Sequence, residues 1–252
     1  MLATFGAEYK TQGAVMRIAI LSDLHANLPF GEAAIRRARF HACDRIVHLG
    51  DAIDFGPWPA ETLDLLLSEG VEMVRGDHDE YPVPGYAPEP GSRFGFDEHA
   101  HMEWTASQLR TDQIALLAGL PARIVSRVEE WRVRFQHYVL DQDRVSEARI
   151  GDAPQDVARQ FGVGPNEILC YGHIHQRLWY FDRNRGILNP GATGFHAGDG
   201  AWFAVLVVRE AGVWIEWHPV ECSSHSVVAE LERRGVPAWP SSVHYMLEAA
   251  VG

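Results

Sequence analysis

The sequence predicts an α/β fold in which parallel strands alternate with helices. Residues 17–21 (RIAIL) form a continuous apolar run, which is typical of a strand covered on both faces. Residues 45–49 (RIVHL) and 71–74 (VEMV) predict two further strands, and a segment with helical spacing lies between each pair. This strand, helix, strand, helix, strand order predicts right-handed parallel crossovers within one sheet.

The two intervening helices are predicted from residue spacing and from an end signal. Residues 31–40 place apolar side chains at helical intervals. Residues 59–69 do the same and are followed by Gly70, which suits the left-handed C-terminal cap of a helix. Both helices therefore have the length that a crossover between parallel strands needs.

The second half of the chain predicts more strands than helices. A surface loop rich in proline and glycine is expected at residues 82–96, and one or two helices at residues 99–120. Strands are then expected at residues 122–128, 131–137, 167–171, 178–181, 202–209 and 213–217. Helices are expected at residues 152–161, 224–234 and 242–250. We see no internal repeat and no long linker, so residues 16–252 predict a single domain that follows a loose extension at residues 1–15.

Composition excludes several classes of protein. A chain of 252 residues that is 46% hydrophobic is able to bury a sizeable core. Its net charge of -12 argues against binding to a nucleic-acid duplex or to an anionic membrane, although metal ions could reverse the charge locally for a small anionic substrate. Three scattered cysteines without CxxC spacing argue against a disulfide framework. No membrane-span pattern and no signal-peptide pattern is present, so we expect a cytoplasmic protein.

Acidic and imidazole side chains follow each of the first three predicted strands. Asp23 and His25 come after the first strand, and two residues apart in an extended segment they project the same way. Asp51 follows Gly50 after the second strand, and residues 76–79 (GDHD) follow the third. Because open α/β sheets place their ligand sites at the carboxyl ends of the strands, we expect these groups to converge.

The second half of the chain supplies matching groups. His173 and His175 follow the strand predicted at residues 167–171, and His137 ends the strand predicted at residues 131–137. Carboxylate oxygen together with imidazole nitrogen suits divalent Mn, Fe, Zn, Co or Ni better than calcium. Because the set is too large for one four-coordinate ion, two divalent transition-metal ions that share one carboxylate are the economical arrangement.

These motifs resemble, in order, those of the calcineurin-like metallophosphoesterases. The family pattern is DxH, GDxxDxGP, GNHD or GNHE, a lone His that is usually in an HG pair, and GHxH. The matching positions are Asp23 and His25; Asp51, Asp54, Gly56 and Pro57; residues 76–79; His137; and His173 and His175. Residues 189–191 (NPG) are also similar to a segment of bacterial members. The resemblance covers nearly the whole chain from residue 16 and implies a four-layer αββα sandwich of two mixed β-sheets flanked by helices.

The resemblance also implies a role for each matching residue. One metal would be held by Asp23, His25, Asp51 and His175. Asp51 would bridge to the second metal, which would be held with Asp77, His137 and His173. In the family a metal-bound hydroxide attacks phosphorus in line, and His78 would contact the phosphate and is the candidate to protonate the leaving oxygen. Asp54 or Asp79 suits the task of orienting a ligand histidine.

Two positions depart from the family pattern. Asp77 stands where the family usually has Asn, and Tyr138 follows His137 where the family usually has Gly. An extra carboxylate should hold the second metal more tightly and lower the positive charge that faces the substrate. We therefore expect an altered metal preference or a lower hydrolytic activity than in an Asn version.

The expected function is metal-dependent hydrolysis of phosphodiesters or phosphomonoesters, with a small phosphoester as substrate. The alternatives are a serine/threonine-type protein phosphatase, a one-metal enzyme, and a non-catalytic metal-binding scaffold protein that retains the fold. Serine-hydrolase, nucleotide-loop and structural-zinc signatures are absent. Substrate specificity is expected to lie in the loops at residues 82–101 and 192–199. His99 and His101 are interpreted as surface or packing positions, with the substrate entrance as the alternative.

Overall fold

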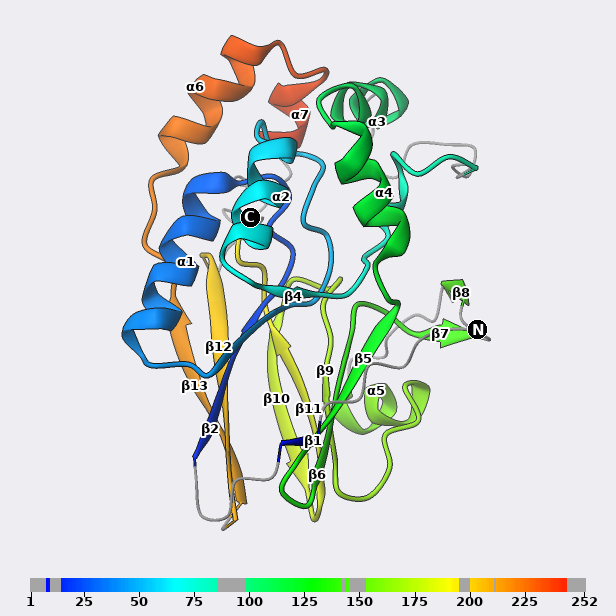
Figure 1. Ribbon diagram of the computed structural model, residues 1–252, viewed down its shortest axis with the longest axis vertical. Helices are drawn as coiled ribbons and strands as arrows, with labels where there is room; N and C mark the ends of the chain where they lie inside the picture. Colours follow the sequence, from blue (N-terminus) through cyan, green and yellow to red (C-terminus); the bar gives the residue numbers. More distant parts are fainter. Residues whose placement is uncertain are drawn as a thin grey trace.

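Two β-sheets pack face to face in the protein, and helices cover both outer faces (Figure 1). The structure is a computed structural model that describes residues 8–9, 15–85, 98–141, 144–145, 153–194, 200–210 and 212–243. The arrangement is the four-layer αββα sandwich, so the predicted fold class is confirmed.

The first sheet contains the three strands that the sequence predicted to be parallel. Its order is β13-β12-β2-β3-β4, in which β2, β3 and β4 run parallel and β12 is antiparallel to both β2 and β13. The bounds are β2 (Met16–Leu21), β3 (Arg45–His48), β4 (Glu72–Met73), β12 (Trp202–Arg209) and β13 (Gly212–Pro219).

The second sheet has the order β1-β5-β6-β9-β11-β10. β6, β9 and β11 are parallel, β5 and β10 are antiparallel to their neighbours β6 and β11, and β1 is parallel to β5. The bounds are β1 (Glu8–Tyr9), β5 (Arg123–Val128), β6 (Trp131–Gln136), β9 (Glu167–Cys170), β10 (Arg177–Asp182) and β11 (Arg185–Pro190). A separate short ladder joins β7 (Leu140–Asp141) to β8 (Arg144–Val145).

Four strands, β1, β7, β8 and β11, lie where the sequence predicted none. β1 falls within residues 1–15, and the rest of residues 1–14 lies outside the described residues. β11 has the sequence RGILNP, in which Gly186 and Pro190 are poor strand residues, yet it pairs in parallel with β9 over residues 185–188 and antiparallel with β10 along its whole length. Tertiary pairing therefore forms a strand that local preference does not indicate.

The helices agree with prediction at most positions. Their bounds are α1 (Leu28–Phe40), α2 (Pro59–Ser68), the 3₁₀ helix η1 (His78–Glu80), α3 (Glu98–Ser107), α4 (Thr111–Gly119), α5 (Pro154–Gln160), α6 (Ser224–Arg234) and α7 (Trp239–Val243). The helix expected at residues 242–250 lies mostly outside the described residues, as does the loop expected at residues 82–96. In the part of the chain that the structure describes, no helix combines the length and the apolar character of a membrane span.

Alternate residues of β2 enter two different cores. Ile18 and Ile20 pack between the two sheets, whereas Ala19 and Leu21 pack beneath the helices, and all four are fully buried. This two-sided burial is the physical reason for the continuous apolar run at residues 17–21.

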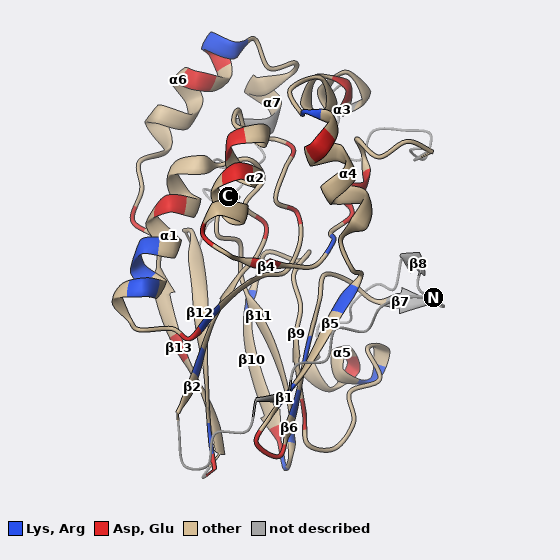
Figure 2. Ribbon diagram, viewed as in Figure 1, with Lys and Arg blue, Asp and Glu red and all other residues tan. Residues whose placement is uncertain are grey.

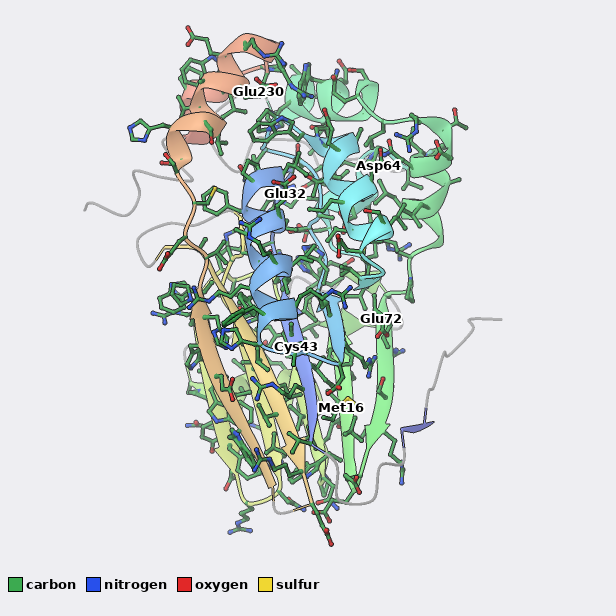
Figure 3. The ribbon with its side chains drawn as sticks, turned by 60° about the vertical axis from the view of Figure 1, so that its left-hand side comes forward. Met16, Glu32, Cys43, Asp64, Glu72 and Glu230 are labelled. Atoms are coloured by element: carbon green, nitrogen blue, oxygen red, sulfur yellow. The ribbon has the colours of Figure 1, made fainter. Side chains whose placement is uncertain are left out.

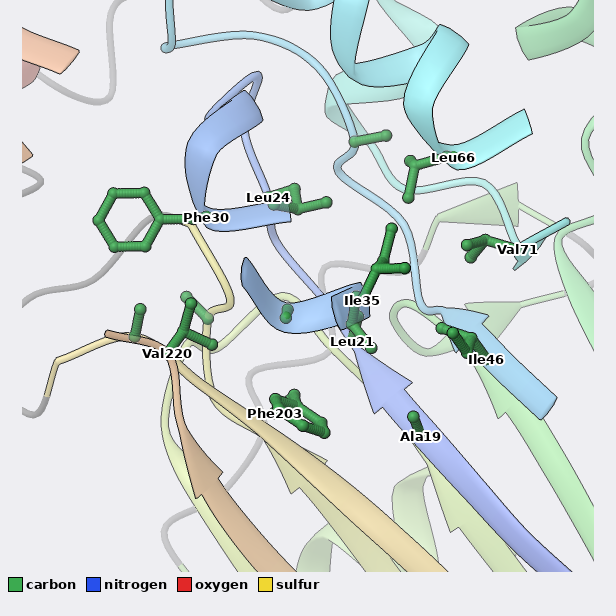
Figure 4. Close-up of a cluster of buried hydrophobic side chains, with 14 of the residues drawn as sticks. Ala19, Leu21, Leu24, Phe30, Ile35, Ile46, Leu66, Val71, Phe203 and Val220 are labelled. Carbon is green, nitrogen blue, oxygen red and sulfur yellow. The ribbon is translucent and has the colours of Figure 1, made fainter. Parts of the chain in front are cut away.

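The core on the helix side joins α1 and α2 to the first sheet. Figure 4 shows Ile35 of α1 directly above Leu21, Leu66 of α2 higher in the view, and Phe203 of β12 below them. Figure 3 shows the two helices side by side across that face of the sheet. A smaller cluster, which includes Val157 and Phe161, packs α5 against the second sheet. Helices thus pack on the outer face of each sheet, and the loops that follow β2 and β3 lead directly into α1 and α2.

Candidate metal centre

All seven side chains predicted as metal ligands meet at one end of the sandwich. They come from loops that follow strands of both sheets and form two groups, and within each group the ligand atoms lie within 4.8 Å of one another. One group is Asp51, Asp77, His137 and His173, and the other is Asp23, His25 and His175. The division follows the one that the family resemblance implied, except that Asp51, which was expected to serve both metals, is grouped only with Asp77, His137 and His173.

The first group is joined by short contacts around His137. Its Nε2 lies 3.0 Å from Asp51 Oδ2 and 3.1 Å from Asp77 Oδ1. His173 Nδ1 lies 3.1 Å from the same oxygen of Asp77. His137 Nδ1 donates a hydrogen bond to the carbonyl oxygen of Leu49 at 2.8 Å, because a carbonyl only accepts. Nε2 therefore faces the two carboxylates, and a metal ion that displaced its proton would find this nitrogen beside both of them.

The second group adjoins the first through Asp51. His175 Nε2 lies 3.2 Å from Asp23 Oδ1, and His25 Nε2 lies 3.7 Å from Asp51 Oδ2. The oxygen of Asp51 that faces His25 is the same one that faces His137. Asp51 is therefore placed to share its carboxylate between the two groups.

Backbone strain is concentrated at the centre. Five of the predicted ligands have positive φ angles, a region that residues other than glycine seldom adopt: Asp23 (53°), His25 (46°), Asp51 (58°), His173 (72°) and His175 (58°). Gly76 allows the loops to pack this closely, because a Cβ there would overlap the carboxylate of Asp51. Such strain persists only where the surrounding structure holds it, which is typical of functional sites.

Asp79 holds the loops rather than a ligand histidine. Its carboxylate accepts hydrogen bonds from the amides of Asp51, Ala52 and Gly76, each at 2.9 Å. Burial and the nearby charge of Asp51 raise the pKa of Asp79 to about 7. The expectation that Asp54 or Asp79 orients a ligand histidine is not what the described contacts show, because Leu49 orients His137 and Asp54 contacts His78.

The charges of the cluster favour a bound cation. Asp23, Asp51 and Asp77 are close together, and burial alone would raise the pKa of each carboxyl. The neighbouring imidazoles outweigh this effect and lower the pKa of all three. The pKa of His137 is in turn raised well above its usual value, because the attraction of the carboxylates exceeds the effect of burial.

The donor set fits divalent metal ions. Three buried or half-buried carboxylates need positive charge nearby, and protonated imidazoles are a weaker source of it than metal ions. Asp23 Oδ2 is fully buried and has no hydrogen-bond partner within the described residues, which leaves one oxygen for a cation. Mixed oxygen and nitrogen ligands suit Mn, Fe, Zn, Co or Ni.

His78 lies beside the ligand groups. Its Nδ1 is 2.7 Å from Asp54 Oδ2, its amide donates to Asp51 Oδ1 at 3.0 Å, and its Nε2 is 3.9 Å from Asp77 Oδ2. Burial lowers the pKa of His78, but the charges of Asp51, Asp54 and Asp77 raise it to about 10. One nitrogen of the imidazole is therefore held by Asp54, and the other is directed to the ligand groups.

Sequence reasoning did not assign His101 and Thr105 to the site. Both are buried on α3 and contact Asp54 Oδ1, at 3.2 Å and 3.1 Å respectively. His99, by contrast, is exposed and pairs with Glu103. Helical spacing was the one available signal, because His101 and Thr105 are four residues apart and so share a helix face.

Comparison with known proteins shows the family. Residues 16–211 match the calcineurin-like phosphoesterase superfamily domain, and the chain belongs to this family. The resemblance seen in the sequence motifs is therefore confirmed.

Similar proteins are found in archaea and bacteria. An uncharacterized protein of Methanocaldococcus jannaschii is 24% identical over 237 residues, which are 88% of this chain and 94% of that one. The crystal structure of a metallophosphoesterase from Sphaerobacter thermophilus is 25% identical and has a TM-score of 0.71, covering 94% of this chain and 99% of that one. A hypothetical protein from Pyrococcus horikoshii OT3, 17% identical, has a TM-score of 0.72 over 92% of this chain and 98% of that one, and it supports the fold alone.

Proposed function

We propose that this protein is a dinuclear metal-dependent phosphoesterase that hydrolyses small phosphodiesters or phosphomonoesters. The observation that carries the proposal is the shared carboxylate of Asp51, whose Oδ2 faces His137 in one ligand group and His25 in the other. Membership of the calcineurin-like phosphoesterase superfamily supports hydrolysis of phosphoesters as the reaction class.

Each ion has its own set of ligands in the proposal. Asp23, His25 and His175 would hold one ion, and Asp77, His137 and His173 the other, with Asp51 common to both. When bound, two divalent ions neutralise charge on the phosphate oxygens and make a water molecule more acidic. The shape of the loops around Asp51 keeps the two groups adjacent.

His78 supplies the proton that the leaving group needs. In hydrolysis a water oxygen forms a bond to phosphorus, the bond from phosphorus to the ester oxygen breaks, and the ester oxygen takes a proton. His78 Nε2 faces the ligand groups and carries that proton, while the excess proton of the water passes to solvent. Asp54 accepts the hydrogen bond from Nδ1 and stabilises the charged imidazolium before the transfer.

The substrate reaches the centre from the side of His173 and His175. Their side chains are 38% and 22% exposed, whereas those of His25, Asp51 and His137 are at most 2% exposed. Figure 2 shows acidic residues in the helices and loops at this end of the molecule, so bound cations would supply most of the positive charge that attracts an anionic substrate. An anionic substrate would bind only to the metal-loaded protein.

Metal analysis and a two-substrate assay test the proposal. The protein is stripped with a chelator, reloaded with Mn²⁺, and assayed with p-nitrophenyl phosphate as monoester and bis(p-nitrophenyl) phosphate as diester. We expect two ions per chain. We also expect Mn²⁺-dependent release of nitrophenol from at least one of the two substrates. One ion per chain with full activity would support a one-metal enzyme instead.

A phosphoserine peptide, added to the assay as a third substrate, separates the remaining alternatives. Two bound ions without turnover of either compound, or of a phosphoserine peptide, would support a non-catalytic metal-binding scaffold. Turnover of the peptide alone would support a protein phosphatase.

A further inference from the structure

The carboxylate of Asp54 connects His78 to helix α3. One oxygen, Oδ2, accepts the hydrogen bond from His78 Nδ1 at 2.7 Å. The other oxygen, Oδ1, lies 3.2 Å from His101 Nε2 and accepts a hydrogen bond from the Thr105 hydroxyl at 3.1 Å. Asp54, His101 and Thr105 are each 1% exposed, so water contributes little to holding this carboxylate.

His101 is itself fixed from its other side. Its Nδ1 lies 3.0 Å from the carbonyl oxygen of Pro237, in the segment between α6 and α7. The ring also packs near Phe55, with ring centroids 5.7 Å apart, and Phe55 in turn packs against His78 at 4.8 Å. His101 thus joins three parts of the chain: the loop after β3, helix α3 and the connection before α7.

A charged imidazole suits the surroundings of His101. Its Nδ1 donates to the carbonyl oxygen of Pro237, and its Nε2 lies at an ion-pair distance of 3.2 Å from Asp54 Oδ1 without hydrogen-bond geometry. Burial opposes this charge, but the attraction of Asp54 prevails and the pKa of His101 is raised. Asp54 therefore lies between the two imidazoles, with Oδ2 toward His78 and Oδ1 toward His101.

We propose that His101 is a positioning residue, which fixes Asp54 so that Asp54 directs His78 toward the substrate. The φ angle of Asp54 is 74°, so its backbone is strained and its side chain must be held by contacts. His101 and Thr105 together occupy Oδ1, which leaves Oδ2 for His78 Nδ1. The kinetic part of the proposal rests on the proposed hydrolase function, but the positioning itself does not.

Two amide substitutions separate the contacts of His101. In His101→Gln the side-chain amide reaches the position of Nε2 and keeps a donor for Asp54. In His101→Asn the amide reaches only the position of Nδ1, so it keeps the contact with Pro237 and loses the contact with Asp54. His99→Gln is the matched control, because His99 is on the same helix and pairs with a carboxylate but faces solvent. Thermal unfolding identifies any variant that does not fold.

The kinetic readout depends on the leaving group. Phenolate is a stronger base than p-nitrophenolate, so phenyl esters need the proton from His78 more than p-nitrophenyl esters do. We expect His101→Asn to lower kcat for the phenyl ester by about 10- to 100-fold, with a smaller loss for the p-nitrophenyl ester and little change in KM. His101→Gln should lower this kcat less than His101→Asn does, and His99→Gln should leave it unchanged.

A second readout does not need turnover. In histidine-¹⁵N-labelled, Zn²⁺-loaded protein, the His78 Nδ1 proton should give a slowly exchanging resonance that is absent from His78→Asn. We expect this proton to exchange rapidly with water in His101→Asn and to remain protected in His101→Gln and His99→Gln.

The outcomes are distinguishable. Protection of the His78 proton in folded His101→Asn would overturn the proposal, as would equal kinetic losses for the two esters or for the Asn and Gln variants. If the wild type hydrolyses neither ester, the proposed function fails, and the exchange measurement alone still decides the role of His101.

Discussion

Asp51 Oδ2 lies 3.0 Å from His137 Nε2, although Asp51 follows β3 of the first sheet and His137 follows β6 of the second. The candidate metal centre therefore connects the two halves of the sandwich. Hydrophobic contacts join the sheets over most of their area, including Ile18, Phe135 and Leu206. At the end of the sandwich that carries the candidate metal centre, carboxylates and imidazoles make this connection. Their contacts depend on the protonation of the imidazoles and on any bound cation.

Metal removal is expected to destabilise the fold. An ion that binds only the folded protein adds about 2.7 kcal/mol to the free energy of unfolding when it is present at 100 times its Kd. Thermal unfolding with Mn²⁺ and with a chelator measures the effect, and we expect a clearly lower Tm without metal. Asp51→Asn removes the shared carboxylate and should abolish most of the Mn²⁺ effect. Asp64→Asn, at an exposed acidic position on α2, should leave it unchanged.

Asp77→Asn is expected to weaken the group that contains His137 and His173. Asp77 Oδ1 lies 3.1 Å from both imidazoles, and an amide oxygen there would carry no formal charge. We expect the Mn²⁺ affinity of one site to fall by at least about 10-fold, the lower end of losses seen when supporting contacts of a metal site are removed. Calorimetric titration measures this directly. Equal affinity and equal turnover in the two proteins would show that the carboxylate has no special effect.

His78→Asn is expected to separate catalysis from metal binding. The Asn amide keeps a donor for Asp54 but has no counterpart of Nε2, which faces the ligand groups. General acid catalysis contributes about 10²- to 10⁴-fold, so kcat should fall within that range for a phenyl ester. Metal content should stay at the wild-type value. A variant that lost metal as well would indicate that His78 supports the ligands instead of the leaving group.

The grouping of the seven candidate ligands was open to prediction because each lies at or beyond the end of a predicted strand. Asp23, Asp51 and His173 lie just beyond β2, β3 and β9, and the parallel arrangement of these strands within each sheet brings such positions to one edge. Short motifs located the residues, and strand order then explained their convergence.

His101 and β11 could not be predicted in the same way. The role of His101 depends on where α3 lies relative to Asp54 and Pro237, which no local pattern specifies. β11 contains Gly186 and ends at Pro190, so its own preferences argue against a strand, and its pairing with β9 and β10 decides the outcome. Both features arise from contacts between distant segments.

The ion pair between Arg17 and Glu216 predicts a pH dependence of stability far from the metal centre. Arg17 of β2 donates to both carboxylate oxygens of Glu216 on β13, at 3.0 Å and 2.6 Å. These hydrogen bonds lower the pKa of Glu216 from its ordinary value of 4.5. Because the pKa is lower in the folded state, the stabilisation is complete above the unfolded pKa and is lost as pH falls through the folded pKa.

Glu216→Gln is therefore expected to destabilise the protein at pH 7 and to matter less at acid pH. A partly exposed pair contributes about 0.2 to 1 kcal/mol, so the difference in the free energy of unfolding should lie in that range at pH 7 and shrink below about pH 4. Urea unfolding at a series of pH values measures it. Glu221→Gln, at an exposed position beyond the end of β13, is the control and should show no such pH dependence. A difference that grew as the pH fell would have the wrong sign for this ion pair.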